Sequence, residues 1–154
     1  MKASAGTAQN NTGKEPCMNV VVIDAQGGGI GKQLIIEIRK KIPYLHITAV
    51  GTNASASAAM LKAGADQAAC GENAAIVCAR RADVIIGPVG IVIADAMLGE
   101  ITPKIAQAVG ASDAKRILIP FRNCDTVIAG VSDLSVSQLI QEAVKELNTM
   151  IKAD

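Results

Sequence analysis

Short apolar runs alternate with amphipathic segments along most of the chain. Mostly apolar runs bounded by turn residues are typical of buried parallel strands. The expected strands are Met18–Ile23, His46–Val50, Ala65–Cys70, Asp83–Ile86 and Lys115–Ile119. Between them, apolar positions recur every three or four residues, which is the period of an amphipathic helix. The expected helices are Lys32–Lys41, Ala54–Ala63, Glu72–Arg81, Thr102–Val109 and Ser135–Lys152.

Turn and capping residues support these boundaries. Pro43 ends the first helix, because proline lacks the amide that a helix needs, and Gly64 is a C-cap for the second. Thr102 followed by proline is a good helix start, and Ser135 with Gln138 forms a capping box. Two segments are less regular: we expect a helix over Ile91–Leu98 and a sixth strand, at the edge, over Thr126–Ala129.

Strands that alternate with helices predict right-handed βαβ crossovers. The expected fold class is therefore α/β: a three-layer, Rossmann-like, doubly wound sheet of about five parallel strands plus the possible edge strand. We expect a disordered leader over residues 1–17, which are polar and end at Pro16 and Cys17, and a single domain over residues 18–154.

Composition narrows the function classes. The 154 residues are 50% hydrophobic but only 1% aromatic, and the formal net charge is +1. Such a chain is too apolar for disorder and lacks the charge that holds nucleic acid or anionic lipid. No apolar run approaches the roughly 20 residues of a membrane span, and the N-terminus has no signal-peptide core. We therefore expect a cytoplasmic protein without nucleic-acid or membrane partners.

Metal and thiol chemistry is not indicated. Cys17, Cys70, Cys78 and Cys124 form no C-x-x-C pair, and His46 is the lone histidine. These residues make no zinc-binding pattern, so no metal site is expected and the thiols are expected to stay reduced.

The sharpest motif is the glycine-rich segment Val20–Lys32, V-V-V-I-D-A-Q-G-G-G-I-G-K, in which an expected strand runs through a turn into a helix. Glycines let the backbone approach a phosphate, and the start of the helix supplies amide groups and partial positive charge. The candidate residues are Asp24, Gln26, Gly27, Gly28, Gly29, Ile30, Gly31 and Lys32. Alternatively, the glycines only permit close packing of helix on strand.

This loop does not match a standard nucleotide motif. The spacing G-x-G-x-x-G is interrupted by Lys32, and the P-loop pattern is absent. Its end, Gly29-Ile30-Gly31, resembles the G-x-x-x-G-I-G loop of short-chain dehydrogenases, with Ala25 in place of the first glycine.

Two further loops follow strands at the same edge of the predicted sheet, where ligands of open α/β sheets bind. The residues are Gly51, Thr52, Asn53, Gly87, Pro88 and Gly90, and Pro120–Asn123 forms a third such loop. The acidic residue that binds an NAD ribose at the end of the second strand is missing, since neutral residues stand there. The cofactor is therefore open: NAD(P) or another nucleotide.

No catalytic motif is recognisable. The Tyr-x-x-x-Lys pair of short-chain dehydrogenases is absent, because no lysine follows Tyr44, the lone tyrosine, at that spacing. His46 is more typical of a surface or packing residue than of a general base. Carboxylates at strand ends remain: Asp24 closes the first strand, and Asp95 and Glu100 follow the fourth.

The segments V-V-I-D-A-Q-G-G-G-I-G-K, A-V-G-T-N-A, A-D-V-I-I-G-P-V-G-I-V-I-A-D-A-M-L-G-E-I-T-P and K-R-I-L-I-P resemble a family of small bacterial proteins, mainly from anaerobic Firmicutes, described only as a domain of unknown function. The resemblance implies the fold and a cytoplasmic origin, but no mechanism.

Three functions remain open. The first is a sensor or regulatory module that binds a nucleotide, a dinucleotide or another small phosphate-containing ligand. The second is a small enzyme that acts on a phosphorylated metabolite through Asp24, Asn53, Asp95 or Glu100. The third is a structural, self-assembling protein with an empty cleft. The apolar stripe of the last helix also predicts a homo-oligomer.

Overall fold

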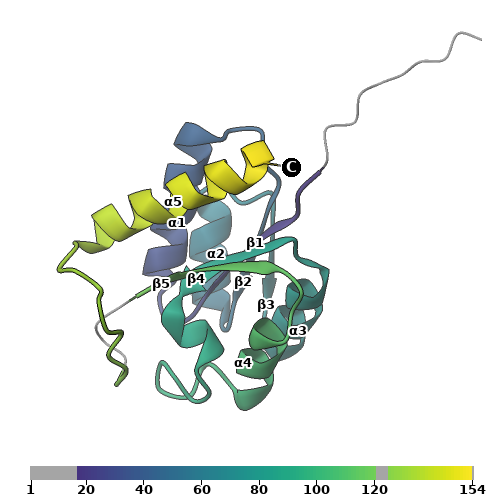
Figure 1. Cartoon of the computed structure of the whole chain (residues 1–154). Helices are drawn as coiled ribbons and strands as arrows, with labels where there is room; N and C mark the ends of the chain where they lie inside the picture. Colours follow the sequence, from purple (N-terminus) through teal and green to yellow (C-terminus); the bar gives the residue numbers. More distant parts are fainter. Residues whose placement is uncertain (1–16, 121–124, 154) are drawn as a thin grey trace, which may run out of the picture.

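The computed structural model describes residues 17–120 and 125–153, and in these residues five parallel strands form one sheet (Figure 1). The strand order is β3-β2-β1-β4-β5. The strands are β1 (Val20–Asp24), β2 (Ile47–Gly51), β3 (Gln67–Cys70), β4 (Val84–Pro88) and β5 (Lys115–Ile119). Every residue of the three central strands β1, β2 and β4 is buried, which explains their continuous apolar sequence.

Helices cover both faces of the sheet, as predicted for a doubly wound fold. The helices are α1 (Gly29–Lys41), α2 (Ala54–Lys62), α3 (Glu72–Arg81), α4 (Pro103–Gly110) and α5 (Val136–Ala153), with a 3₁₀ turn η1 (Val89–Val92) after β4. Side chains of β1 alternate between the two faces: Val20 and Val22 pack with α1, α2 and α5, whereas Val21 and Ile23 pack with α3 and α4. The Rossmann-like fold class is therefore confirmed.

Helix ends follow the predicted capping residues. The Thr102 hydroxyl accepts the amide of Ile105, and Ser135 and Gln138 exchange hydrogen bonds in a capping box. Gly64 follows α2 with φ +116, a conformation that glycine adopts without strain. The start of α1 lies earlier than predicted, at Gly29 instead of Lys32, because the glycine-rich segment itself forms the first turn.

The helix that we predicted over Ile91–Leu98 is wrong. After η1 the chain turns back on itself, and Asp95, Met97 and Leu98 adopt φ values of 63°, 55° and 58°. A right-handed helix cannot contain such left-handed residues. The amide of Asp95 donates instead to the carbonyl of Ile101 at 2.8 Å, which closes a compact loop. We call residues 93–100 the wall loop.

The sixth strand predicted over Thr126–Ala129 is also wrong. These residues have no strand pairing, and Val127 is 95% exposed. Among the described residues the sheet ends at β5, and no strand pairs with its outer edge.

Some predictions fall on residues that the structure does not describe. They are the leader, apart from Cys17, and Phe121, Arg122, Asn123 and Cys124 in the loop after β5. Across residues 17–120 and 125–153, no helix combines the length and the apolar character that a membrane crossing requires.

Candidate functional site

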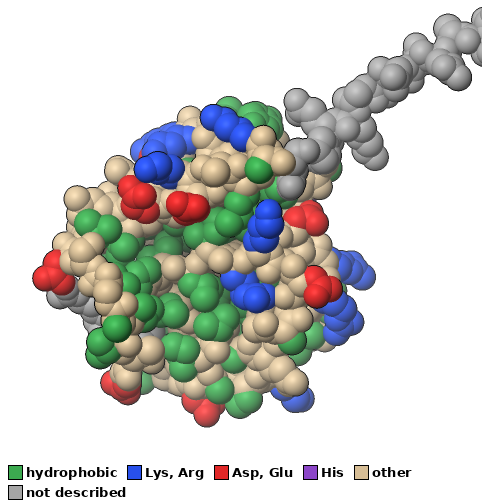
Figure 2. All heavy atoms as spheres, viewed as in Figure 1, with side chains coloured by type: hydrophobic (Ala, Val, Ile, Leu, Met, Phe, Trp, Pro, Cys, Tyr) green, Lys and Arg blue, Asp and Glu red, His purple; other side chains and the backbone are tan. Residues whose placement is uncertain are grey.

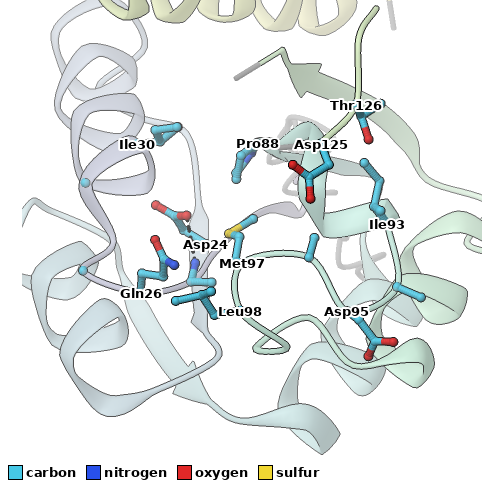
Figure 3. A pocket seen from close by; sticks show the side chains of 15 residues that line it. Asp24, Gln26, Ile30, Pro88, Ile93, Asp95, Met97, Leu98, Asp125 and Thr126 are labelled. Carbon is cyan, nitrogen blue, oxygen red and sulfur yellow. Dashed lines mark hydrogen bonds between the residues drawn. The ribbon is translucent and has the colours of Figure 1, made fainter. Parts of the chain in front are cut away.

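A pocket of about 690 Å³ lies at the carboxyl ends of β1 and β4 (Figure 3). The chain runs from β1 to β2 on one side and later returns to β4 on the other, so the strand order reverses here. Ligands of open α/β sheets bind at this reversal. The lining residues are Asp24, Ala25, Gln26, Gly27, Gly29, Ile30, Pro88, Ile93, Ala94, Asp95, Ala96, Met97, Leu98, Asp125 and Thr126.

Asp24 joins the end of β1 to the start of α1. Its side chain is buried, with one oxygen accepting the amide of Ala25 at 2.8 Å and the other accepting that of Gly31, also at 2.8 Å. The second bond satisfies one of the free amides that every helix start presents. Burial raises the pKa of Asp24, and the carboxylate of Glu100 adds to the rise, while the backbone bonds oppose it.

The glycines of the loop divide into two sets. Gly27 and Gly29 line the pocket, and a Cβ atom at either position would meet open space. Gly28 and Gly31 are packing glycines instead: a Cβ on Gly28 would come within 2.9 Å of the Ala56 backbone, and one on Gly31 would collide with Met60. The packing interpretation therefore holds for Gly28 and Gly31, whereas Gly27 and Gly29 border the pocket without packing contacts of this kind.

The other predicted loop residues also divide. Pro88 lines the pocket, whereas Gly87 packs against the Ile23 carbonyl and Gly90 is buried in η1. Gly51 packs against Ser57 at the start of α2. Lys32 is exposed and does not line the pocket.

Thr52 and Asn53 hold a carboxylate from elsewhere in the chain. The Glu100 Oε1 atom accepts the Asn53 amide at 2.6 Å, the Thr52 hydroxyl at 2.8 Å and the Gln26 backbone amide at 3.0 Å. Burial favours the neutral form of Glu100, but these three bonds outweigh it and lower its pKa. We call Glu100, Gln26, Thr52 and Asn53 the Glu100 cluster.

The sequence did not predict that most of the wall loop lines the pocket. It also did not predict that the segment after β5 lines the opposite side. Ile93, Met97 and Leu98 make the pocket largely apolar, and Asp125 and Thr126 enter from the segment after β5. No local signal marks these residues, because their position depends on the turned-back path of residues 93–100. In Figure 3, Asp24 and Asp125 border the same space, while Asp95 lies at the lower rim.

The histidine and the cysteines of the described residues lie outside any arrangement that could bind a metal ion. Among the residues that the structure describes, no group of three or more histidine, cysteine or acidic side chains is placed to hold a metal ion. Cys17, Cys70 and Cys78 are free thiols, and burial raises the pKa of Cys78, which makes it less reactive. His46 lies 3.5 Å from Asp66 and does not line the pocket.

The fold and the pocket define a Rossmann-like α/β protein with a pocket at the reversal of its strand order. The profile of the family described as "Domain of unknown function (DUF3842)" matches residues 19–152, and the chain belongs to this family. A search of curated proteins finds no match.

Among solved structures, the chain is similar to the dodecameric FMN-dependent UbiX-like decarboxylase from Escherichia coli O157:H7. The identity is 18%, the alignment covers 85% of this chain and 76% of that chain, and the TM-score is 0.41. At this level the likeness carries no inference about what this chain binds.

Proposed function

We propose that the protein is a binding module, with a sensor or regulatory role, for a nucleotide or a similar organic phosphate. The observation that carries the proposal is the position of the pocket, which opens at the switch point between the glycine loop and Pro88. Gly27 and Gly29 leave backbone without side chains along one wall. The start of α1 adds partial positive charge to the same wall, which favours a phosphate.

The other walls suit the rest of a nucleotide. Ile93, Met97 and Pro88 offer aliphatic surface to a base, since the described pocket lining contains no aromatic side chain. Asp125 and Thr126 offer acceptors for sugar hydroxyl groups. The pocket volume of about 690 Å³ is in the range of small-molecule sites.

Asp24 opposes an anionic ligand unless its charge is compensated. Its raised pKa favours the neutral form, and a divalent cation bound with the phosphate would serve the same purpose. The proposal therefore expects nucleotide binding to be strengthened by Mg²⁺ or by lower pH.

Isothermal titration tests the proposal. AMP, ATP, GTP, FMN, NAD and NADP are titrated into the protein with and without Mg²⁺. Saturable binding of at least one ligand with one site per chain is expected. The absence of saturable binding across the panel would overturn the nucleotide-binding function.

An enzymatic role has one specific observation in its favour. Three carboxylates, those of Asp24, Asp95 and Asp125, line the same pocket, and the buried one has a raised pKa. Perturbed carboxylates in clefts are candidates for acid–base work. Turnover of a bound phosphate ester, followed by ³¹P NMR, would identify this alternative; a bound ligand that stays unchanged would exclude it for that ester.

The proposal also includes assembly of this chain into a homo-oligomer in the cytoplasm. The apolar stripe of α5 packs on α1 and β5 within the chain, so it does not supply the interface that we expected from it. Other apolar side chains are exposed, including Leu98 at 96% and Val127 at 95%, and Figure 2 shows hydrophobic side chains gathered across the face below α5. Light scattering coupled to size exclusion should give a mass above the 15.8 kDa of one chain; a monomer at all concentrations would refute the oligomer.

A further inference from the structure

We infer that the pocket accepts a single mononucleotide and excludes a dinucleotide. This inference rests on the proposed function and narrows it. Dinucleotides bind doubly wound sheets across the switch point, with one mononucleotide half on each side of the reversal. In this protein the pocket covers one side, at β1 and β4, and the Glu100 cluster occupies the other, at the end of β2.

The Glu100 cluster uses the groups that the second half of a dinucleotide would need. The Thr52 hydroxyl and the Asn53 side-chain NH2 group both donate to Glu100. The Asn53 side-chain oxygen accepts the backbone amide of Ala56 and so caps the start of α2. The Gln26 amide, at the bend of the glycine loop, also donates to Glu100. A nucleotide at the end of β2 would therefore have to replace three hydrogen bonds before it made one of its own.

The wall loop holds Glu100 in this position. Asp95, Met97 and Leu98 all adopt left-handed backbone conformations, each of which costs a non-glycine residue on the order of 1–2 kcal/mol. Such strain persists only where the surrounding structure fixes it. Here the fixed end is Ile101, which is fully buried and bonds to Asp95 and Ala96 through its backbone.

The negative charge of Glu100 also opposes a dinucleotide, in addition to the space that the Glu100 cluster occupies. The bonds within the cluster keep the pKa of Glu100 low, so at neutral pH the end of β2 carries a negative charge beside the glycine loop. This charge repels the second phosphate of a dinucleotide and, more strongly, the additional 2′-phosphate of NADP. A mononucleotide confined to the pocket carries no second phosphate to the end of β2.

The test compares AMP, NAD and NADP by isothermal titration against the wild type, Glu100→Ala and a control, Glu142→Gln, which changes an exposed glutamate on α5. The wild type and the control should bind AMP at least tenfold more tightly than either dinucleotide. Glu100→Ala should reduce the ratio of AMP affinity to dinucleotide affinity at least fivefold. The substitution removes both the side chain that occupies the end of β2 and its negative charge.

Two results would overturn the inference: a wild type that binds NAD as tightly as AMP, or a Glu100→Ala variant that folds and keeps the wild-type ratio. If Glu100→Ala loses its helical circular dichroism signal, Glu100→Gln decides instead. It keeps an acceptor oxygen for the three donors and removes the charge, so a narrowed NADP ratio supports the inference and an unchanged one overturns it. Binding of no nucleotide at all would instead refute the proposed function itself.

Discussion

The Glu100 carboxylate lies 2.6 Å from the side-chain amide of Asn53, although 47 residues separate the two. Asn53 follows β2, where dinucleotide-binding proteins place an acidic residue for the ribose, and the sequence has no acid there. The fold supplies one from the wall loop. A carboxylate therefore does lie at the end of β2, but it accepts hydrogen bonds from donors of the chain itself.

The Glu100 cluster should make stability depend on acid pH. Its hydrogen bonds hold the pKa of Glu100 below the ordinary value of 4.5, so its contribution is present above that pH and is lost as pH falls through the folded-state pKa. Urea unfolding at pH 7 and pH 3 should show wild type more stable than Glu100→Gln at pH 7, with the difference shrinking at pH 3. Glu142→Gln serves as control, and a difference that grows in acid would contradict the assignment.

The adjacent residues Gly27 and Gly28 should differ in how much stability an alanine substitution costs. Gly28→Ala places a Cβ 2.9 Å from the Ala56 backbone at a φ of +69°, and we expect it to lower the free energy of unfolding by about 2 kcal/mol. Gly27→Ala meets open space and should change stability by less than about 0.5 kcal/mol. Thermal unfolding followed by circular dichroism measures both; equal losses would show that the packing role of Gly28 is wrong.

Asp24→Asn should strengthen binding of a phosphate-containing ligand. Removing one negative charge near the bound phosphate is worth roughly 1.4 kcal/mol, or about tenfold in affinity. Because the pKa of Asp24 is raised, the wild type loses this charge as pH falls, and the gain should therefore shrink in acid. Titrations at pH 7.5 and pH 5, with exposed Asp113→Asn as control, check this. The melting temperature is compared as well, because asparagine has one acceptor oxygen for the two backbone amides that Asp24 accepts. Weaker binding by Asp24→Asn at both pH values, at an unchanged melting temperature, would mean that the carboxylate contacts the ligand favourably.

Arg39 should be a stability residue outside the pocket. Its guanidinium donates to the carbonyls of Gly64 and Leu45 and pairs with Asp66 at 2.6 Å, which ties α1 to the segments that precede β2 and β3. Arg39→Ala should lower the free energy of unfolding by about 2 kcal/mol, whereas Lys40→Ala, which removes an exposed lysine from the same helix, should have little effect. Nucleotide affinity should be unchanged in both; a loss of affinity in Arg39→Ala alone would contradict this role.

The strands and helices of the fold could be predicted because each is determined largely by its own residues and by the residues next to it. Buried strands such as β1 are continuously apolar, and caps such as Thr102 and Ser135 mark helix starts within a few residues. The wall loop could not be predicted, because its apolar residues fit a helix equally well. Its path is decided by distant partners: Glu100 reaches the end of β2, and Ile101 enters the core.

The candidate site was predicted in part for the same reason. The glycine loop lies within one strand–turn–helix unit, so Asp24, Gly27 and Gly29 were found from the sequence. Lys32 was among the candidate residues, but it does not line the pocket. Asp125 comes from a segment whose position depends on the whole fold, and no pattern in its own neighbourhood indicates that it borders the pocket.

The most direct test of the central claim is titration of AMP, in the presence of Mg²⁺, into the wild type and Gly27→Leu. A leucine at this position meets no neighbouring atom at its Cβ, yet it adds bulk to the lining of the pocket. We predict saturable binding of one AMP per wild-type chain and at least tenfold weaker binding by Gly27→Leu at an unchanged melting temperature. Equal affinity in the two proteins, or no binding to the wild type, would contradict a nucleotide site at the glycine loop.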